Sequence, residues 1–374
     1  MRYILSLILS AVLLVTVPFA SSAYSARSMV LIEQSTKSVI TQTNMHSRLP
    51  MASTTKIMTA LVVLETASLD TVISVPAAAT GVEGSSMYLL TGEKLTVSDL
   101  LYGLMLTSGN DAATALAISL CGDIPKFVAL MNEKAKSLGL ENTHFANPSG
   151  LPDDEHYTTA YELAILTAIA LQNETFAKIV STKTAKVPYN NNPGGRTLVN
   201  HNKLLSLYDG AIGVKTGFTK KAGRCLVGAA IRDGVTLVCV TLNDGDDWND
   251  HITAFDYGFS VAKQTILCQE NQLEIKLKTP DGKEINAYNR DTLKTVTVGE
   301  SRVDMVVKAP QFLYPPLSAG DTVGKIEYLK DDEVIASTPL YITQSVDPPP
   351  FKKELLITKI INTIKGFIKS LWQN

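Results

Sequence analysis

The sequence is poor in cysteine, histidine and net charge. Among its 374 residues are four Cys and five His, and 34 basic against 36 acidic side chains leave a formal net charge of −2. Cys121, Cys225, Cys239 and Cys268 are far apart and form no CxxC pair, which excludes a disulfide-dense scaffold and a cysteine-rich zinc site. A near-neutral chain also provides no field for nucleic acid. We therefore expect no nucleic-acid partner, no metal and no cofactor.

Apolar residues, by contrast, are plentiful. They make up 45% of the chain, and the mean hydropathy is +0.11. This composition excludes a largely disordered protein, and the length allows two or three domains.

The first 265 or so residues mix strand and helix patterns. Residues 29–33 and 39–42 predict a hairpin, and residues 224–230 and 235–242 predict another around Arg232-Asp233-Gly234. Helical patterns lie between them, over 54–66, 96–121, 125–138 and 159–172. Strands on both sides of a helical stretch predict an α+β fold, with one sheet and helices packed on it.

Residues 268–346 have a different texture. Segments around 273–277, 303–307 and 323–329 alternate apolar and polar residues, and turn signals stand at 280–282 and 330–332. This pattern predicts a small all-β domain. We therefore expect domains over 24–267 and 268–346, followed by a Pro-rich spacer and a tail over 347–374.

The N-terminus has the pattern of a secretory signal. Residues 3–20 carry no charge, follow Arg2, and lead into Ser21-Ser22-Ala23. The small residues at the −3 and −1 positions favour cleavage after Ala23, so residues 1–23 are predicted to be a signal peptide. The alternative is an uncleaved anchor, because the apolar run almost reaches the length of a membrane span.

The C-terminal tail predicts an amphipathic helix. Five Lys and one Glu give residues 351–374 a charge of +4, whereas the body between the signal and the tail carries −7. Apolar residues recur on one helical face, at Ile357, Ile360, Ile361, Ile364, Ile368 and Leu371. The lysines interrupt the tail too often for a span, so we expect an in-plane anchor on the outer face of the cytoplasmic membrane. The alternative is a helix docked on the body.

A Ser-x-x-Lys motif, Ser53-Thr54-Thr55-Lys56, is a candidate nucleophile with its base. Pro50 suits the first turn of a helix, which places Ser53 near a helix N-terminus, and at this spacing Ser and Lys share one face. A buried Lys can lose its proton near neutral pH and deprotonate the hydroxyl. The motif alone arises by chance in a chain of this length, and a second copy stands at Ser260 and Lys263.

Two further elements follow Ser53 in order. Ser108-Gly109-Asn110 comes after a helical run, and Lys215-Thr216-Gly217 stands directly before the second hairpin. Taken singly, they would be a helix-linking turn and an ordinary strand start. The ordered set SxxK, SxN, KTG is the signature of penicillin-interacting serine enzymes, and a chance triple at workable spacing is rare. The Ser260 copy has neither partner after it, so we interpret it as a surface helix face.

With these motifs the chain resembles the low-molecular-weight penicillin-binding proteins that are serine-type D-alanyl-D-alanine carboxypeptidases, peptidase family S11. Family-like blocks also occur at 84–89, 147–151, 156–160, 202–205 and 209–219. The resemblance covers roughly residues 29–260, and the β domain and tail match the family's layout. It implies a β-lactamase/transpeptidase-like catalytic domain, a small all-β domain and a C-terminal amphipathic helix.

The resemblance also implies a reaction. The protein would remove the terminal D-Ala from peptidoglycan stem pentapeptides, face the cell wall after export, and be acylated by β-lactam antibiotics. Ser53 would form the acyl-enzyme and Lys56 would take its proton. Ser108 would relay a proton to the leaving amine, while Asn110 would hold the substrate amide and orient Lys56.

The same resemblance implies the binding groups. Lys215 and Thr216 would bind the terminal carboxylate, and Gly217 would let the peptide approach the strand edge as an added strand. The backbone N–H groups of Ser53 and Phe218 would form the oxyanion hole.

Two features bear on these roles. His156 falls in a family block and is interpreted as tying down a loop, not as a base. Gram-negative members often have an arginine near residues 247–251 that aids carboxylate binding. No Arg occurs here between Arg232 and Arg290, which leaves that role to Lys215 and Thr216.

Competing functions differ from this one at single residues. A class A β-lactamase uses SDN and a Glu in an E-x-x-L-N block, but here the second motif is Ser-Gly-Asn and Glu162 is followed by Leu-Ala-Ile-Leu. A catalytically dead binding protein would have lost Ser53, Lys56 or Lys215, and all are present. A D,D-endopeptidase stays open because the same chemistry serves both reactions. Stem-peptide preference and a vegetative or sporulation role also stay open, as does the choice between free thiols, which we favour, and a disulfide for Cys225 and Cys239.

Overall fold

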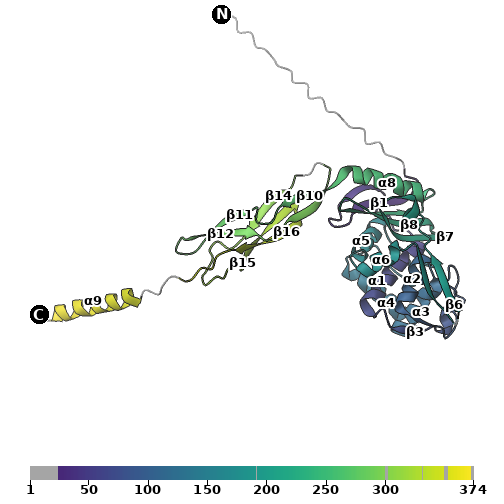
Figure 1. Ribbon diagram of the computed structural model, residues 1–374, viewed down its shortest axis with the longest axis horizontal. Helices are drawn as coiled ribbons and strands as arrows, with labels where there is room; N and C mark the ends of the chain where they lie inside the picture. The colour runs from purple at the N-terminus through teal and green to yellow at the C-terminus, as the bar shows by residue number, and fades with distance from the viewer. Residues whose placement is uncertain (1–23, 191, 300–301, 331, 349–352, 372–374) are drawn as a thin grey trace, which may run out of the picture. The chain divides into compact units, whose positions relative to one another are not determined.

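The computed structural model describes residues 24–190, 192–299, 302–330, 332–348 and 353–371 (Figure 1). The predicted signal peptide, residues 1–23, lies outside them. The chain packs as two compact units. The first holds residues 24–30, 41–228 and 239–254 among those described, and the second holds 31–40, 229–238 and 255–371.

The main sheet has five strands in the order β2–β1–β9–β8–β7. Their bounds are β1 Ser28–Glu33, β2 Val39–Thr43, β7 Ala211–Thr219, β8 Gly223–Arg232 and β9 Val235–Leu242. Both predicted hairpins are therefore present. Asp233 and Gly234, between β8 and β9, have φ of 50° and 77°, as a two-residue hairpin turn requires. Because β7 ends the strand order, one of its sides faces no other strand of this sheet.

Helices make up most of the remaining chain up to Val261. Their bounds are η1 Ala52–Thr55, α1 Lys56–Thr66, η2 Ala77–Ala79, α2 Val97–Leu106, α3 Asn110–Cys121, α4 Ile124–Ser137, α5 Ala160–Ala170, α6 Glu174–Ser181, α7 Leu204–Leu207 and α8 Asp247–Val261. Two small ribbons complete it, β3 Val72–Ser74 with β4 Lys94–Thr96, and β5 Thr184–Tyr189 with β6 Asn192–Val199. Every residue of α1 from Lys56 to Val63 is buried, so this helix lies inside the helical layer.

The prediction of one helix over 96–121 is wrong. The chain breaks between α2 and α3, where Ser108 has a φ of 60° and so cannot continue a right-handed helix. The N–H of Asn110 then donates to the carbonyl of Ser85 at 2.7 Å, outside either helix. Apolar periodicity runs on through this break because both helices bury residues against the same layer.

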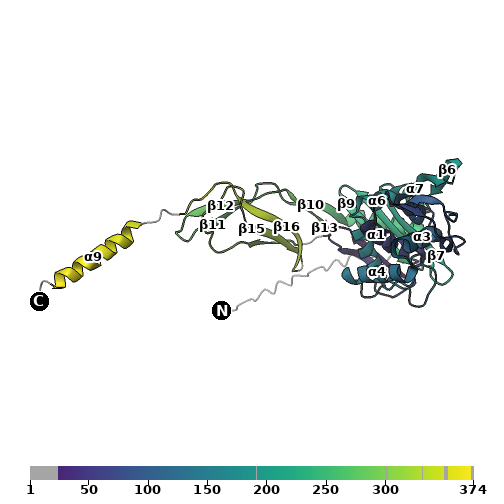
Figure 2. The same cartoon turned by 90° about the horizontal axis from the view of Figure 1, so that it is seen from below.

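The described residues of 268–346 form β-strands and no helix, which confirms the predicted all-β character of this part of the chain. β10 Ala262–Cys268 pairs with β13 Leu293–Val298. A five-stranded antiparallel sheet has the order β11–β12–β16–β15–β14, with bounds β11 Glu274–Lys278, β12 Glu284–Asn289, β14 Asp304–Lys308, β15 Thr322–Lys330 and β16 Glu333–Ile342. Figure 2 shows these strands from a second side.

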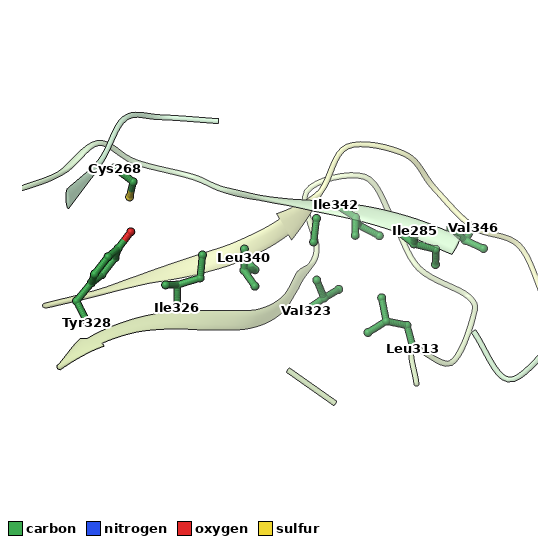
Figure 3. Packing of buried hydrophobic residues seen from close by; sticks show 10 residues of the cluster. Cys268, Ile285, Leu313, Val323, Ile326, Tyr328, Leu340, Ile342 and Val346 are labelled. Atoms are coloured by element: carbon green, nitrogen blue, oxygen red, sulfur yellow. The ribbon is translucent and has the colours of Figure 1, made fainter. Parts of the chain in front are cut away.

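One face of this sheet carries the domain's apolar core. Ile326 and Tyr328 of β15 lie with Leu340 and Ile342 of β16 in a cluster of buried side chains (Figure 3). Ile326, Leu340 and Ile342 have no exposed surface. The alternation around 323–329 thus places Ile326 and Tyr328 on the buried face, whereas Met305 and Val307 of β14 stay exposed.

The last described element is α9, Lys353–Leu371. Its apolar side chains at Ile360, Ile364 and Phe367 are 51%, 51% and 67% exposed. In the described part of the chain no single helix is long and apolar enough to cross a membrane. Two bent helix pairs, α3 with α4 and α5 with α6, reach the necessary length and apolar composition only when each pair is taken together.

Candidate active site

Ser53 lies in the short helix η1, directly before α1. Lys56 is the first residue of α1 and has no exposed surface. Its Nζ lies 3.1 Å from Ser53 Oγ. The helical spacing predicted from Ser53-Thr54-Thr55-Lys56 therefore brings hydroxyl and amine into contact.

Lys56 has two further partners, and both are acceptors. Its Nζ donates to Asn110 Oδ1 at 2.6 Å and to the carbonyl of Ser149 at 2.6 Å. The Asn110 amide is oriented because its Nδ2 donates to the carbonyl of Glu83 at 2.6 Å. A neutral amine has two N–H donors and one lone pair. With both donors used on these oxygens, the lone pair faces the Ser53 hydroxyl.

Burial favours the neutral amine. Desolvation is the main cause that holds the pKa of Lys56 well below its ordinary value, and the nearby charge of Lys215 lowers it further. The carboxylate of Asp111 acts in the opposite direction. The Ser53 hydroxyl thus lies beside an amine whose lowered pKa favours the neutral form, which can act as a base.

A tight loop supplies the Ser149 carbonyl. The side-chain oxygen of Asn147 accepts the N–H groups of Ser149, Gly150 and Leu151 at 2.7–3.1 Å. Gly150 has a φ of 89°, and a Cβ there would lie 1.9 Å from the carbonyl oxygen of Ala52. Only glycine allows the backbone at position 150 to approach Ala52 this closely. Gly150 thus lets the loop 147–151 pack against the backbone next to Ser53.

Asp111 fixes the opposite wall. Its carboxylate accepts the N–H groups of Met87 and Leu89, each at 3.0 Å, and the hydroxyl of Ser86 at 2.6 Å. These bonds hold the 84–89 block against the start of α3. Asp111 was not predicted to be a site residue, although it directly follows Asn110.

The serine opens into a cavity of about 470 Å³. Its lining residues are Ser53, Ser85, Ser108, His201, Thr216, Gly217, Phe218, Arg224, Cys225, Asp247 and Trp248. Ser108, from the break between α2 and α3, is thus brought to the same space as Ser53. The three motifs, which are far apart in sequence, meet around one cavity.

Strand β7 forms one side of this cavity. Lys215 is buried, its Nζ donates to the carbonyl of Thr216 at 2.9 Å, and burial lowers its pKa to about 7. A Cβ on Gly217 would lie 3.0 Å from the backbone nitrogen of Ser53, so a side chain there would crowd the serine. Phe218 is 65% exposed on the same strand.

The cavity also contains an ion pair that the sequence did not predict. Arg224 Nη2 lies 2.5 Å from Asp247 Oδ1, and its guanidinium is 5.8 Å from the ring centre of Trp248. The Arg224 side chain is 44% exposed and the Asp247 side chain only 5%. The β7–β8 hairpin is the feature of the sequence from which Arg224 could have been predicted. The start of β8, which holds Arg224, lies beside the end of β7, which holds Thr216–Phe218.

Three other candidates lie elsewhere. His156 accepts the N–H of Ala146 on Nδ1 at 3.0 Å, and its Nε2 is 2.6 Å from Thr55 Oγ1. Burial lowers the pKa of His156 to about 4. Its contacts with Ala146 and Thr55 tie a loop to η1, as expected. Glu162 accepts the N–H of Asn142 at 2.8 Å. The second Ser-x-x-Lys copy is a surface feature, because Ser260 and Lys263 are both exposed.

All four cysteines are free, which favours the thiol interpretation of Cys225 and Cys239 over the disulfide. Burial raises the pKa of the Cys225 thiol to about 11. Within the ranges that the structure covers, no group of three or more His, Cys, Asp or Glu could hold a metal ion.

Two family models match the chain. The D-alanyl-D-alanine carboxypeptidase model matches residues 15–246, and the model of the C-terminal domain of penicillin-binding protein 5 matches residues 269–348. Among curated proteins, the D-alanyl-D-alanine carboxypeptidase DacF of Bacillus subtilis (strain 168) is 32% identical over 395 residues, which cover 99% of this chain and 100% of that protein.

Solved structures agree with the sequence matches. Penicillin binding protein 5 from Haemophilus influenzae superposes with a TM-score of 0.69 at 27% identity, covering 87% of this chain and 98% of that one. The Streptomyces K15 DD-transpeptidase has a TM-score of 0.60 at 36% identity, covering 64% and 98%. With a family model over more than half of its residues and the three motifs around one cavity, the chain belongs to the D-alanyl-D-alanine carboxypeptidase family.

Proposed function

We propose that this chain is a serine-type D-alanyl-D-alanine carboxypeptidase that removes the terminal D-Ala from peptidoglycan stem pentapeptides through an acyl-enzyme on Ser53. β-Lactam antibiotics acylate the same serine. One observation carries the proposal: the amine of Lys56 lies 3.1 Å from Ser53 Oγ at a cavity that Ser108 and Thr216 also line.

Acylation begins at the Ser53 hydroxyl. Lys56 takes its proton as Oγ bonds to the carbonyl carbon between the two D-alanines, because its two N–H donors are held by Asn110 and Ser149. The C–N bond then breaks, and Ser108 relays a proton to the leaving amine of D-alanine. Water attacks the ester in the second half, which releases the shortened peptide and returns the proton to Ser53.

The substrate binds along β7. An extended peptide pairs with the free side of this edge strand, and Gly217 leaves room for it beside the serine. The backbone N–H groups of Ser53 and Phe218 stabilise the oxyanion. Lys215 and Thr216 bind the terminal carboxylate.

Fast β-lactam hydrolysis is the competing activity, and it needs a base for deacylation. Glu162 is the candidate by sequence, yet its carboxylate accepts the Asn142 N–H and the Thr143 hydroxyl, and it does not line the cavity. We therefore expect the penicilloyl ester to persist, whereas the ester formed from the peptide turns over.

The proposed reaction is tested by incubating the full-length chain with a pentapeptide that ends in D-Ala-D-Ala. Mass spectrometry should show the loss of one alanine and the appearance of free D-alanine. An unchanged peptide, with protein that is folded and binds penicillin, would contradict the proposed substrate.

We further propose that Arg224 contributes to carboxylate binding. Among the residues that line the cavity, it is the permanently charged cation, because Arg stays protonated. Buried Lys215 is not among these lining residues, and burial lowers its pKa to about 7. The protonated fraction of Lys215 falls as pH rises through 7, so substrate binding should come to depend more on Arg224 above that pH.

Replacing Arg224 by Gln should raise KM about tenfold or more with little change in kcat, because a hydrogen bond to a charged group contributes about 1.5–3 kcal/mol. Steady-state release of D-alanine at pH 6 and pH 9 measures both constants, and the effect should be larger at pH 9.

The Arg224→Gln change leaves Asp247 buried without its cation, so the R224Q/D247N double variant is measured beside it. Lys221→Gln is the control, since Lys221 pairs with Asp154 and does not line the cavity. Equal KM values for wild type and both Arg224 variants would remove Arg224 from substrate binding.

We propose the domain boundaries 24–267 and 268–346 and the following localisation. Residues 1–23 direct export and are cleaved, and the protein faces the cell wall from the outer face of the cytoplasmic membrane. The helix α9 lies in the membrane surface. Its exposed apolar side chains and its lysines suit an anionic bilayer.

Deleting residues 351–374 should release the signal-processed protein from membranes while penicillin acylation remains. Sedimentation with vesicles that contain anionic lipid measures the binding. A matched variant replaces Ile360, Ile364 and Ile368 by Ser, which keeps the charge and removes the apolar stripe. A truncated, signal-processed protein that still sediments would place the anchor outside residues 351–374 and contradict the proposed role of α9.

A further inference from the structure

The outer strand of the C-terminal sheet lacks a neighbour on one side. β14, Asp304–Lys308, pairs antiparallel with β15 and ends the order β11–β12–β16–β15–β14. All five of its residues are exposed. Among the residues that the structure describes, no strand pairs with its other side. Such an edge offers unpaired N–H and C=O groups to another strand.

The apolar core of the domain continues onto this edge without cover. Met305 and Val307 stand opposite Tyr328 and Ile326 of β15, so they lie on the same face of the sheet as these two core residues, which Figure 3 labels. Yet Met305 is 48% and Val307 37% exposed, whereas Tyr328 is 6% and Ile326 0% exposed. An added strand would extend the sheet and cover these two side chains.

The sequence of β14 matches itself in antiparallel pairing. With Val306 opposite Val306 of a second copy, Asp304 falls opposite Lys308 at both ends. On the core face, Met305 falls opposite Val307. We propose that two copies of this chain associate through β14, paired about a two-fold axis at Val306. This charge arrangement is what selects a second copy as the occupant.

Neighbouring residues suit this register. Val303, already packed on the core, falls opposite Ala309, and Pro310 then ends the ladder because it has no N–H. Each charged end also has a partner within its own chain. Asp304 Oδ1 accepts from Arg302 Nε at 2.9 Å, in a pair whose side chains are 87% (Arg302) and 60% (Asp304) exposed. Lys308 contacts Glu327 at 2.6 Å, but Glu327 has a second cation in Lys325 at 2.6 Å. A five-residue strand buries less area than the ~1,000 Å² of a stable interface, so the association is weak and needs covalent capture.

The test is disulfide capture in the full-length chain, solubilised in detergent and treated with a mild oxidant. Opposite residues of antiparallel strands have Cα atoms about 4.5–5.5 Å apart, within disulfide range. Val306→Cys should therefore give a covalent dimer that reductant dissolves. Val334→Cys is the matched control, because Val334 is 51% exposed in the same domain but lies on the inner strand β16. It should cross-link at least about tenfold more slowly. The unsubstituted chain controls for the native thiols.

Charge reversal tests the register. On the Val306→Cys background, Asp304→Lys or Lys308→Asp brings like charges opposite each other at both ends, and each should slow capture at least about threefold. The double exchange, D304K/K308D, restores opposite charges and should restore the rate. Penicillin acylation of each variant verifies that the serine site is intact, since neither substitution touches it.

Each remaining outcome overturns the proposal. Equal capture at positions 306 and 334 would mean random collision. A double exchange as slow as the single reversals would refute the two-fold register. A cross-linked product of a mass other than twice the chain, formed in native membranes, would assign the edge to a different protein.

Discussion

Ser53→Ala should abolish labelling by penicillin and lower D-alanine release at least about a thousandfold, the scale on which loss of a serine nucleophile acts. The reason is chemical: Ser53 is the hydroxyl within hydrogen-bond distance of the buried amine of Lys56. Intact-mass spectrometry after incubation with penicillin measures the adduct directly.

Two matched variants sharpen this expectation. Ser260→Ala should label like wild type, since Ser260 belongs to an exposed Ser-x-x-Lys copy and donates to the carbonyl of Tyr257. Ser108→Ala should retain a slower, stoichiometric label, because Ser108 lines the cavity and is proposed to relay a proton without bonding to the substrate. A full adduct on Ser53→Ala would end the assignment of the nucleophile.

Lys56→Arg should slow acylation by about 10²–10⁴-fold, the usual contribution of a general base. Arg cannot supply a lone pair near neutral pH, because its pKa lies above about 12. In the wild type, the neutral fraction of Lys56 grows as pH rises through its lowered pKa, so acylation should rise with pH. This rising limb should be absent in the variant. Stopped-flow acylation by a chromogenic β-lactam from pH 5 to 9 records both effects.

Folding is the necessary control, since Lys56 is fully buried and Arg is larger. Thermal unfolding of Lys56→Arg is compared with that of Lys56→Met, which removes the amine without added volume. If Lys56→Met is folded and still acylates at a near-normal rate, another group is the base.

Part of what surrounds the serine could be predicted from the sequence, for a physical reason. The pattern Ser53-x-x-Lys56 needs only one helical turn to bring its groups together, and the β8–β9 hairpin needs only the Asp233-Gly234 turn. Local geometry decides both, so both could be predicted without knowledge of the tertiary fold.

Contacts between distant segments could not be predicted in this way. The break at Ser108 is stabilised by the Asn110 N–H bond to Ser85, across a loop whose position depends on the whole helical layer. Arg224 was missed because its role depends on the cavity side of β8 and on Asp247 at the start of α8. Sequence spacing does not report which side chains of different elements share a cavity.

The central claim is that Ser53 carries the acyl group of a D-Ala-D-Ala peptide. Rapid quenching of the full-length chain with a pentapeptide, followed by proteolysis and mass mapping, tests it most directly. We expect a peptidyl ester, one alanine shorter than the substrate, on the fragment that contains Ser53. An ester on another residue, or D-alanine release at the wild-type rate without any ester on Ser53, would contradict it.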